Sequence, residues 1–189
     1  MLGYRPTTRS VSIISMRSQI LHTARRLTLE GGAVPSLNAV VEAAGVSKGG
    51  LMHHFPTRSA LVVGLARQAL DEVDAAMVEA AAVGAAARTW LELSLPDDND
   101  RALLQALASS FRPTDDEFGP LLRDSVVAID RWEALIASEV GDEIQAHAIR
   151  LVGDALVANS LVGLNRDQEN VDALLRFLTF ERASTDDAR

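Results

Sequence analysis

The 189-residue chain contains no cysteine, a single lysine (Lys48) and only 4% aromatic residues. Without cysteine it forms neither a disulfide framework nor a metal site built on thiolates. No apolar run approaches the roughly 20 residues that a membrane-spanning helix needs, and the apolar segment 11–16 is too short for a signal peptide. We therefore expect a protein of the cytoplasm with no membrane association.

Acidic residues are scarce near the N-terminus and abundant elsewhere. Residues 1–70 hold eight Lys and Arg against two Asp and Glu, a charge of +6, whereas residues 71–189 hold ten against 24, a charge of −14. The two sum to the net charge of −8. Such an asymmetry indicates a polyanionic partner at the basic end. The alternative is an acidic surface that serves only to keep the protein in solution.

The basic part contains a pattern typical of two short helices joined by a glycine turn, at residues 36–58. Ser36 is a good N-cap, and apolar residues then recur at helical spacing until Gly45, where the chain can turn in the left-handed conformation. Ser47 is the next N-cap. The first turn of the helix that follows, residues 48–50, contains two glycines and therefore presents few side chains. This arrangement predicts a DNA-reading helix-turn-helix. The inner apolar residues, which we assign to the core, are Leu37, Val40, Leu51 and Phe55.

At these residues the chain resembles the TetR family of transcriptional repressors. The sequence departs from the family at Gly50, where Thr or Ala is frequent, and at Met52 and His53, where one position is usually aromatic. The resemblance implies a long fourth helix that carries ligand-induced motion to the DNA-binding unit, and pairing of two copies through their last helices. The matching positions are Ala43-Ala44-Gly45-Val46-Ser47-Lys48-Gly49, Leu51, His54-Phe55-Pro56, Arg58 and Ala60-Leu61.

The rest of the chain shows helical periodicity with short breaks and no alternating strand pattern. We predict an all-α protein of about nine helices, in which an N-terminal three-helix DNA-binding unit is joined by a long helix to a C-terminal ligand-binding and dimerisation bundle. The first expected helix spans 17–30. The others span about 59–83, 84–95, 101–111, 117–140, 143–164 and 170–182, with a disturbance at Gly119-Pro120 and capping turns at 97–100 and 113–116.

These elements divide the chain into four predicted parts. They are a mobile N-terminal arm at 1–15, the helix-turn-helix domain at 16–62, the ligand-binding and dimerisation domain at 63–183, and a polar tail at 184–189. The arm carries Arg5 and Arg9, which either reach a groove or phosphate of DNA or belong to a disordered terminus.

A set of residues around the helix-turn-helix is predicted to contact DNA. Lys48 is placed to reach a phosphate or a guanine edge, and small or cationic residues at helix starts suit phosphate positioning. Asn38 alternatively reaches an adenine edge, and His54 is alternatively a buried hydrogen-bonding residue. The full set is Ser36, Asn38, Ser47, Lys48, Gly49, Gly50, Met52, His53, His54, Thr57 and Arg58.

The segment 143–164 is apolar around most of its circumference, so it needs cover on two sides. In a chain of this size a second copy is the natural second cover. A homodimer also places two reading helices in major grooves about 34–36 Å apart, as a palindromic operator requires. The predicted interface residues are Leu151, Ala155, Val162, Leu174 and Leu178.

Large, adaptable side chains of the C-terminal part either pack the core or line an apolar ligand pocket. His147 and Asn159 stand on a mostly apolar helix, where they orient a ligand or pair across the dimer seam. Arg150 and Asp154 are spaced to pair with each other. The predicted ligand-binding residues are Met77, Trp90, Phe111, Phe118, Trp132, His147 and Asn159.

These features predict a sequence-specific DNA-binding regulator: a homodimeric repressor, not an enzyme, that a largely apolar small molecule releases from double-stranded operator DNA. We predict no cofactor and no metal, since His53 and His54 diverge by about 100° on a helix. One alternative is a helical small-molecule-binding protein without DNA binding. The other is a hydrolase that uses Ser47, because residues 45–49 match G-x-S-x-G, although that motif needs a preceding strand.

Overall fold

The computed structural model describes residues 15–111, 116–164 and 171–179. Within these ranges all regular structure is helical, which confirms the predicted all-α fold of about nine helices. The predicted arm up to residue 14, the turn at 113–115 and the tail at 184–189 lie outside the described residues. The helices are α1 (Met16–Gly31), α2 (Leu37–Ala44), α3 (Lys48–His54), α4 (Arg58–Ala81), α5 (Ala86–Leu93), α6 (Asp98–Ser110), α7 (Phe118–Val140), α8 (Glu143–Leu161) and α9 (Val171–Leu178).

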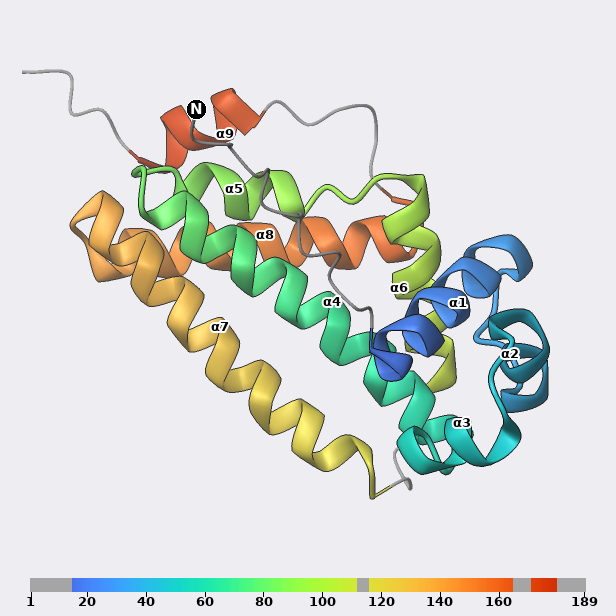
Figure 1. Ribbon diagram of the computed structural model, residues 1–189. Helices are drawn as coiled ribbons and strands as arrows, with labels where there is room; N and C mark the ends of the chain where they lie inside the picture. The colour runs from blue at the N-terminus through green and yellow to red at the C-terminus, as the bar shows by residue number, and fades with distance from the viewer. Residues whose placement is uncertain (1–14, 112–115, 165–170, 180–189) are drawn as a thin grey trace, which may run out of the picture.

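Helices α1, α2 and α3 cluster at one end of the molecule, which we call the head, and α9 lies at the other end against α5 (Figure 1). The long helix α4 leaves the head and runs beside α7, while α8 packs on α5 and α7. We call α5 to α9 the body. No helix among the described residues combines the length and apolarity needed to span a membrane.

Side-chain caps determine where most helices begin. Six residues each accept a hydrogen bond from the backbone N–H three positions later, at 2.8–3.2 Å. Such a cap satisfies one of the N–H groups that a helix start leaves without a partner. The predicted caps at Ser36, Ser47 and Asp97 are confirmed. The full set is Ser15, Ser36, Ser47, Thr57, Asp97 and Asp142.

The disturbance expected at Gly119-Pro120 does not occur. Helix α7 begins at Phe118 and runs without a break to Val140. Pro120 is tolerated because it lies in the first turn, where a backbone N–H has no partner within the helix in any case. Several boundaries also differ from expectation. Helix α6 starts at Asp98, three residues early, and α8 and α9 end at Leu161 and Leu178, earlier than expected.

The buried side chains form two clusters, and α4 contributes to both. The first cluster contains the inner residues of the head, Leu61 and Leu65 of α4, and residues of α6 and α7 that include Leu107 and Phe118. The second lies in the body and contains Met77 of α4 with residues of α5, α7 and α8. Helix α4 therefore joins the packing of the head to that of the body.

Candidate nucleic-acid interface

The turn between α2 and α3 forms as the local sequence predicts. Gly45 has φ 65° and ψ 27°, the left-handed conformation that glycine adopts without strain, and its N–H donates to the Val41 carbonyl at 3.1 Å. The Ser47 hydroxyl accepts from the Gly50 N–H at 3.0 Å. Helix α2 stands where the hydrolase motif requires a strand, so Ser47 caps a helix instead of forming a nucleophile elbow.

Tertiary contacts from α1 and α4 fix α2 and α3 in place. The side chain of Leu51 is fully buried, and Phe55 is 2% exposed. The Phe55 ring lies against Gly64 of α4, where an added Cβ would be 2.5 Å from the ring atom Cε1. The Gln19 amide of α1 donates to the Ala44 carbonyl at the end of α2, at 2.9 Å. One face of helix α3 therefore packs against the core of the head, and the opposite face is exposed.

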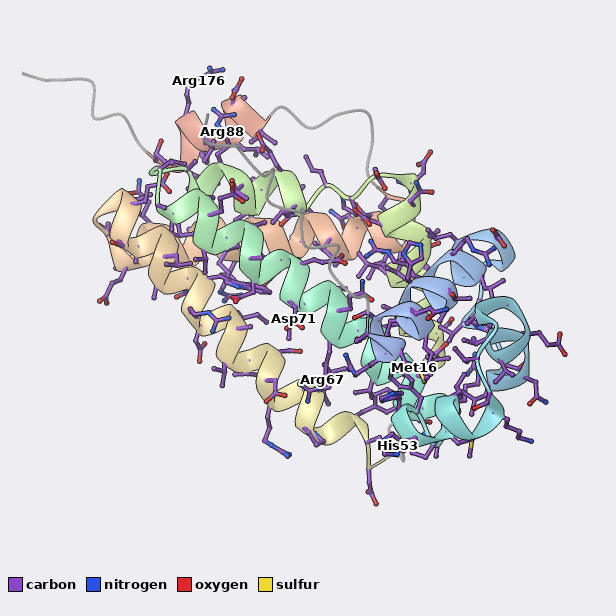
Figure 2. All side chains as sticks on the ribbon, in the orientation of Figure 1. Met16, His53, Arg67, Asp71, Arg88 and Arg176 are labelled. Atoms are coloured by element: carbon purple, nitrogen blue, oxygen red, sulfur yellow. The ribbon has the colours of Figure 1, made fainter. Side chains whose placement is uncertain are left out.

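The uncovered face of α3 consists of Lys48, Gly49, Met52 and His53, which are all exposed. Their spacing of one, four and five places them on a single side of the helix. A Cβ added at Gly49 would meet nothing within 4 Å, and Met52 is 40% exposed. Figure 2 shows His53 at the outer edge of the head. The face combines a cation, a gap without a side chain, a thioether and an imidazole.

Gly50 has no side chain, but it is less exposed than we expected because the side chain of Met16 covers it. A Cβ at Gly50 would lie 3.1 Å from the Met16 sulfur and 3.1 Å from the Ser47 hydroxyl oxygen. Met16 is the first residue of α1 and is 45% exposed (Figure 2). The start of α1 therefore borders the start of α3, an approach that a larger residue at position 50 would hinder.

Most of the predicted DNA-contacting residues lie at the surface. Gly50 and His54 are half-buried, and the His54 ring centroid lies 5.1 Å from that of His53. The exposed members of the set are Ser36, Asn38, Ser47, Lys48, Gly49, Met52, His53, Thr57 and Arg58. These side chains are accessible to a partner; their roles in DNA contact stay predictions.

Besides the N-caps Ser36 and Ser47, Thr57 and Arg58 also have hydrogen-bond partners within the chain. The Thr57 hydroxyl caps α4 and donates to the Glu117 carboxylate, whose oxygens are 2.8 and 2.9 Å away. The Arg58 guanidinium donates to the Val34 carbonyl at 2.8 Å. Glu117 directly precedes α7, so the start of α4 is connected to the body at the edge of the head.

Arg17 was not among the predicted contacts, although it lies in the same region. Its guanidinium carbon is 5.5 Å from the centroid of the Phe55 ring, a cation–π distance. A positive charge in the first turn of a helix is unfavourable with respect to the helix dipole. That unfavourable placement is the signal in the sequence by which Arg17 could have been identified as a candidate contact for an anionic partner.

The predicted ligand-binding residues are not gathered at one place. Met77, Trp90 and Trp132 belong to the second core cluster, where the two indole rings lie 5.6 Å apart. Phe111 and Phe118 pack together at 4.5 Å in the first cluster, beside the head. His147 and Asn159 are exposed on α8. The aromatic residues thus contribute to two separate regions of packing.

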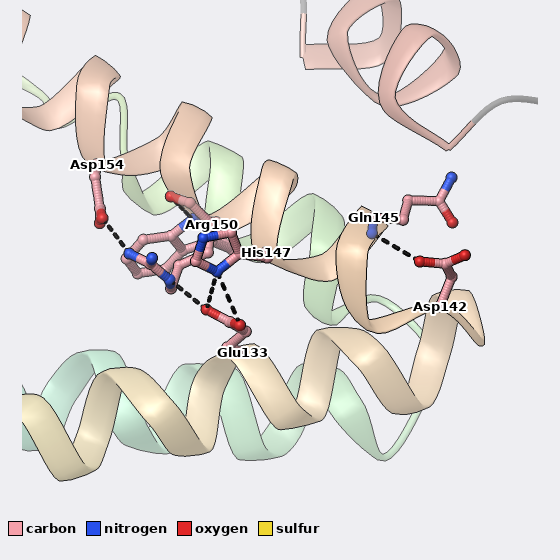
Figure 3. Close-up of polar contacts among 7 residues, drawn as sticks. Glu133, Asp142, Gln145, His147, Arg150 and Asp154 are labelled. Carbon is pink, nitrogen blue, oxygen red and sulfur yellow. Dashed lines mark hydrogen bonds and ion pairs between the residues drawn. The ribbon is translucent and has the colours of Figure 1, made fainter.

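His147 takes part in a polar network between α7 and α8 (Figure 3). Its Nδ1 lies 3.1 Å from one oxygen of Glu133, and Arg150 donates to the same carboxylate. Arg150 also pairs with Asp154, as the spacing predicted. Hydrogen bonding from Arg150 holds the pKa of Glu133 below its ordinary value.

A second polar contact, partly buried, links α4 to α7. The Trp132 indole N–H donates to an Asp74 oxygen at 2.9 Å, and Arg131 pairs with the same carboxylate. Burial opposes the charged form of Asp74, but the hydrogen bonds from Trp132 and Arg131 outweigh it, so its pKa is lowered.

Among the described residues, no group of three or more His, Cys, Asp and Glu is positioned to hold a metal ion.

Residues 20–65 match a family model described as bacterial regulatory proteins, tetR family. The matched segment runs from within α1 to the first turns of α4 and so contains the whole of α2 and α3. A comparison with curated proteins gave no match.

Proposed function

We propose that the chain, whose residues 20–65 match the family model of the tetR family of bacterial regulatory proteins, is a DNA-binding transcription regulator. In this proposal it acts as a homodimeric repressor that a small, largely apolar molecule releases from a palindromic operator. The main support for this proposal is the exposed face of α3. The opposite face of the helix packs against the first core cluster. A short helix with one buried and one open face is the element that helix-turn-helix proteins insert into the major groove.

The charges of the head favour a nucleic-acid partner. Lys48 is exposed at the start of α3, and Arg17 and Arg58 lie at the starts of α1 and α4. Cationic side chains at these positions neutralise phosphates and set the register of the protein on the duplex. The acidic body repels the duplex, which favours binding through the head alone.

The apolar surface of α8 supports pairing with a second copy. Ile144, Leu151 and Val162 are 83%, 48% and 67% exposed, whereas Ile149 and Leu156 on the other side of the helix are buried. Large apolar patches on a protein surface commonly mark interfaces. Of the remaining predicted interface residues, Ala155 is exposed, whereas Leu174 and Leu178 of α9 are half-buried against the second core cluster.

Contacts between head and body supply a route by which a ligand can act on DNA binding. Arg25 of α1 pairs with Glu72 of α4 at 2.6 Å and with Asp100 of α6 at 3.2 Å. The side chain of Phe118 from α7 is buried in the core that supports the head. A ligand that binds better to another arrangement of the body helices shifts the population away from the DNA-binding state.

Replacing Lys48 tests the proposed interface. We expect Lys48→Ala to weaken binding to a selected operator and to reduce the slope of log affinity against log salt by about 1, because one phosphate or base contact is lost. Fluorescence anisotropy at several salt concentrations measures both quantities. Arg88→Ala, which removes a cation from α5 in the body, serves as the matched control.

The outcome separates the proposal from its main alternative. A helical small-molecule-binding protein without DNA function would show weak binding with no preferred sequence. It would also respond equally to Lys48→Ala and Arg88→Ala. Either result would overturn the proposal.

A further inference from the structure

We propose that α3 recognises the C5-methyl group of a pyrimidine in the major groove. The recognising surface, which we call the methyl notch, is the gap at Gly49 bordered by the side chain of Met52, with Met16 beside the neighbouring Gly50. This inference rests on the proposed DNA-binding function and extends it to the base feature that the protein reads.

The first argument is that two methionine side chains are exposed on or beside α3. Met16 and Met52 are 45% and 40% exposed, and they are the large apolar side chains of α1 to α3 that are exposed among the described residues. Burying an apolar side chain against an apolar group is favourable, whereas burying it against a polar base edge is not. The apolar group that the major groove presents is the methyl group at C5 of thymine.

The second argument is the shape of the notch. Gly49 has no side chain, and a Cβ placed there would meet nothing within 4 Å, so a base edge can approach the backbone of α3 closely. Met52 stands three residues later on the same face. Its unbranched thioether side chain adapts its shape to a methyl group more readily than a branched side chain does.

The third argument is the polar chemistry beside the notch. Lys48 and His53 flank Gly49 and Met52 on the exposed face of α3, and the face contains no carboxylate. Carboxylates are the groups that accept from the cytosine amino group, whereas a lysine suits the acceptors of guanine. Lys48 and His53 can donate to acceptors such as guanine O6 or thymine O4, whereas Met52, the apolar member of the face, suits the methyl group at C5.

Thymine and 5-methylcytosine both present this methyl group in the major groove. The experiment distinguishes them. Operator sequences are first selected from a random duplex library with the full-length protein. Each thymine of the selected site is then replaced by deoxyuridine, which lacks only the methyl group, and each cytosine by 5-methylcytosine, in separate duplexes. Affinities are measured for the wild type, Met52→Gln, Met52→Leu and the control Val83→Ala, which changes an exposed apolar residue in the turn after α4.

For thymine reading we expect one deoxyuridine position per half-site to lower the affinity about threefold to fivefold, the effect of one buried methyl group. For 5-methylcytosine reading we expect one methylated cytosine to raise it by a similar factor. In both cases Met52→Gln removes the effect of the methyl group. Met52→Leu, which stays apolar but is branched, retains it in reduced form, and Val83→Ala retains it in full. Met52→Gln keeps the length of an exposed side chain, and a circular dichroism spectrum is recorded to check its folding.

Three results overturn the inference while leaving the proposed DNA-binding function intact. They are binding of a selected site that no removal or addition of a methyl group alters, a methyl effect that persists in Met52→Gln, and an effect that Val83→Ala abolishes as well. If no DNA sequence is selected at all, the proposed function itself fails, and the inference fails with it.

Discussion

The Phe55 ring occupies the space beside Gly64 where any other residue would place a side chain. An added Cβ would lie 2.5 Å from the ring and 3.1 Å from a methyl carbon of Leu21. Both neighbours belong to the core that supports α3, so α4 can pack this closely on the head only with glycine at position 64.

We expect Gly64→Ala to destabilise the protein by about 1–3 kcal/mol, because the ring must move within a packed core. Since Phe55 directly follows α3, DNA affinity should fall as well. Urea unfolding measures the first effect and operator binding the second. Gly31→Ala, where an added Cβ meets nothing within 4 Å, is the matched control. Equal stability of the two variants would contradict the packing argument.

Two carboxylates with lowered pKa values predict the response to acid. Asp74 is held ionised by Trp132 and Arg131, and Glu133 mainly by Arg150. A group whose pKa is lower in the folded state stabilises the protein above its unfolded pKa of about 4, and this contribution is lost as the pH falls through the folded value.

We therefore expect Asp74→Asn and Glu133→Gln to be less stable than the wild type at neutral pH, with differences that shrink below about pH 4. Urea midpoints measured across this pH range test the prediction. Glu79→Gln, at an exposed position of α4, should follow the wild type throughout. A difference that stays constant with pH would indicate that packing, and not ionisation, is responsible.

At the scale of the elements, the carboxylate of Glu117 links the start of α7 to the start of α4. Glu117 accepts from the Thr57 hydroxyl, and the next residue, Phe118, is buried in the core beneath the head. A negative charge at the edge of the head opposes the approach of a phosphate. The position of α7 therefore bears directly on the electrostatics of DNA binding.

We expect Glu117→Gln to strengthen operator binding several-fold at low salt, because the variant loses the charge but keeps an acceptor for Thr57. The gain should diminish as salt screens the charge. Asp130→Asn removes the same charge from an exposed position farther along α7 and is the control. If both variants gain equally, the effect is one of net charge, and the local argument is wrong.

At the scale of the whole molecule, the proposed dimer pairs through the exposed apolar side of α8, which would determine whether two heads act together. We expect Leu151→Glu to convert a dimer into monomers, since it places a charge on that side, and to weaken operator binding because the second head is no longer tethered. Sedimentation velocity measures the first effect. Val83→Glu, at an apolar position 78% exposed after α4, should remain dimeric. A monomeric wild type would contradict the proposed assembly.

The sequence by itself determined the local features of the fold. The caps at Ser36, Ser47 and Asp97 formed as predicted, and so did the left-handed turn at Gly45. The pairing of Arg150 with Asp154 is likewise local. These features depend on residues only a few positions apart, so capping, conformational preference and helical spacing suffice to predict them.

Only the tertiary structure decided which distant residues meet. Met16 covers Gly50, Thr57 bonds to Glu117, and the aromatic residues of the body divide between two core clusters. The pairs Met16–Gly50 and Thr57–Glu117 join segments that are far apart in the sequence. Helical periodicity predicts which face of a helix is buried, but it does not predict which element packs against that face. The crossing of α1, α4 and α7 brings these residues together, and with them the surface that we propose contacts DNA.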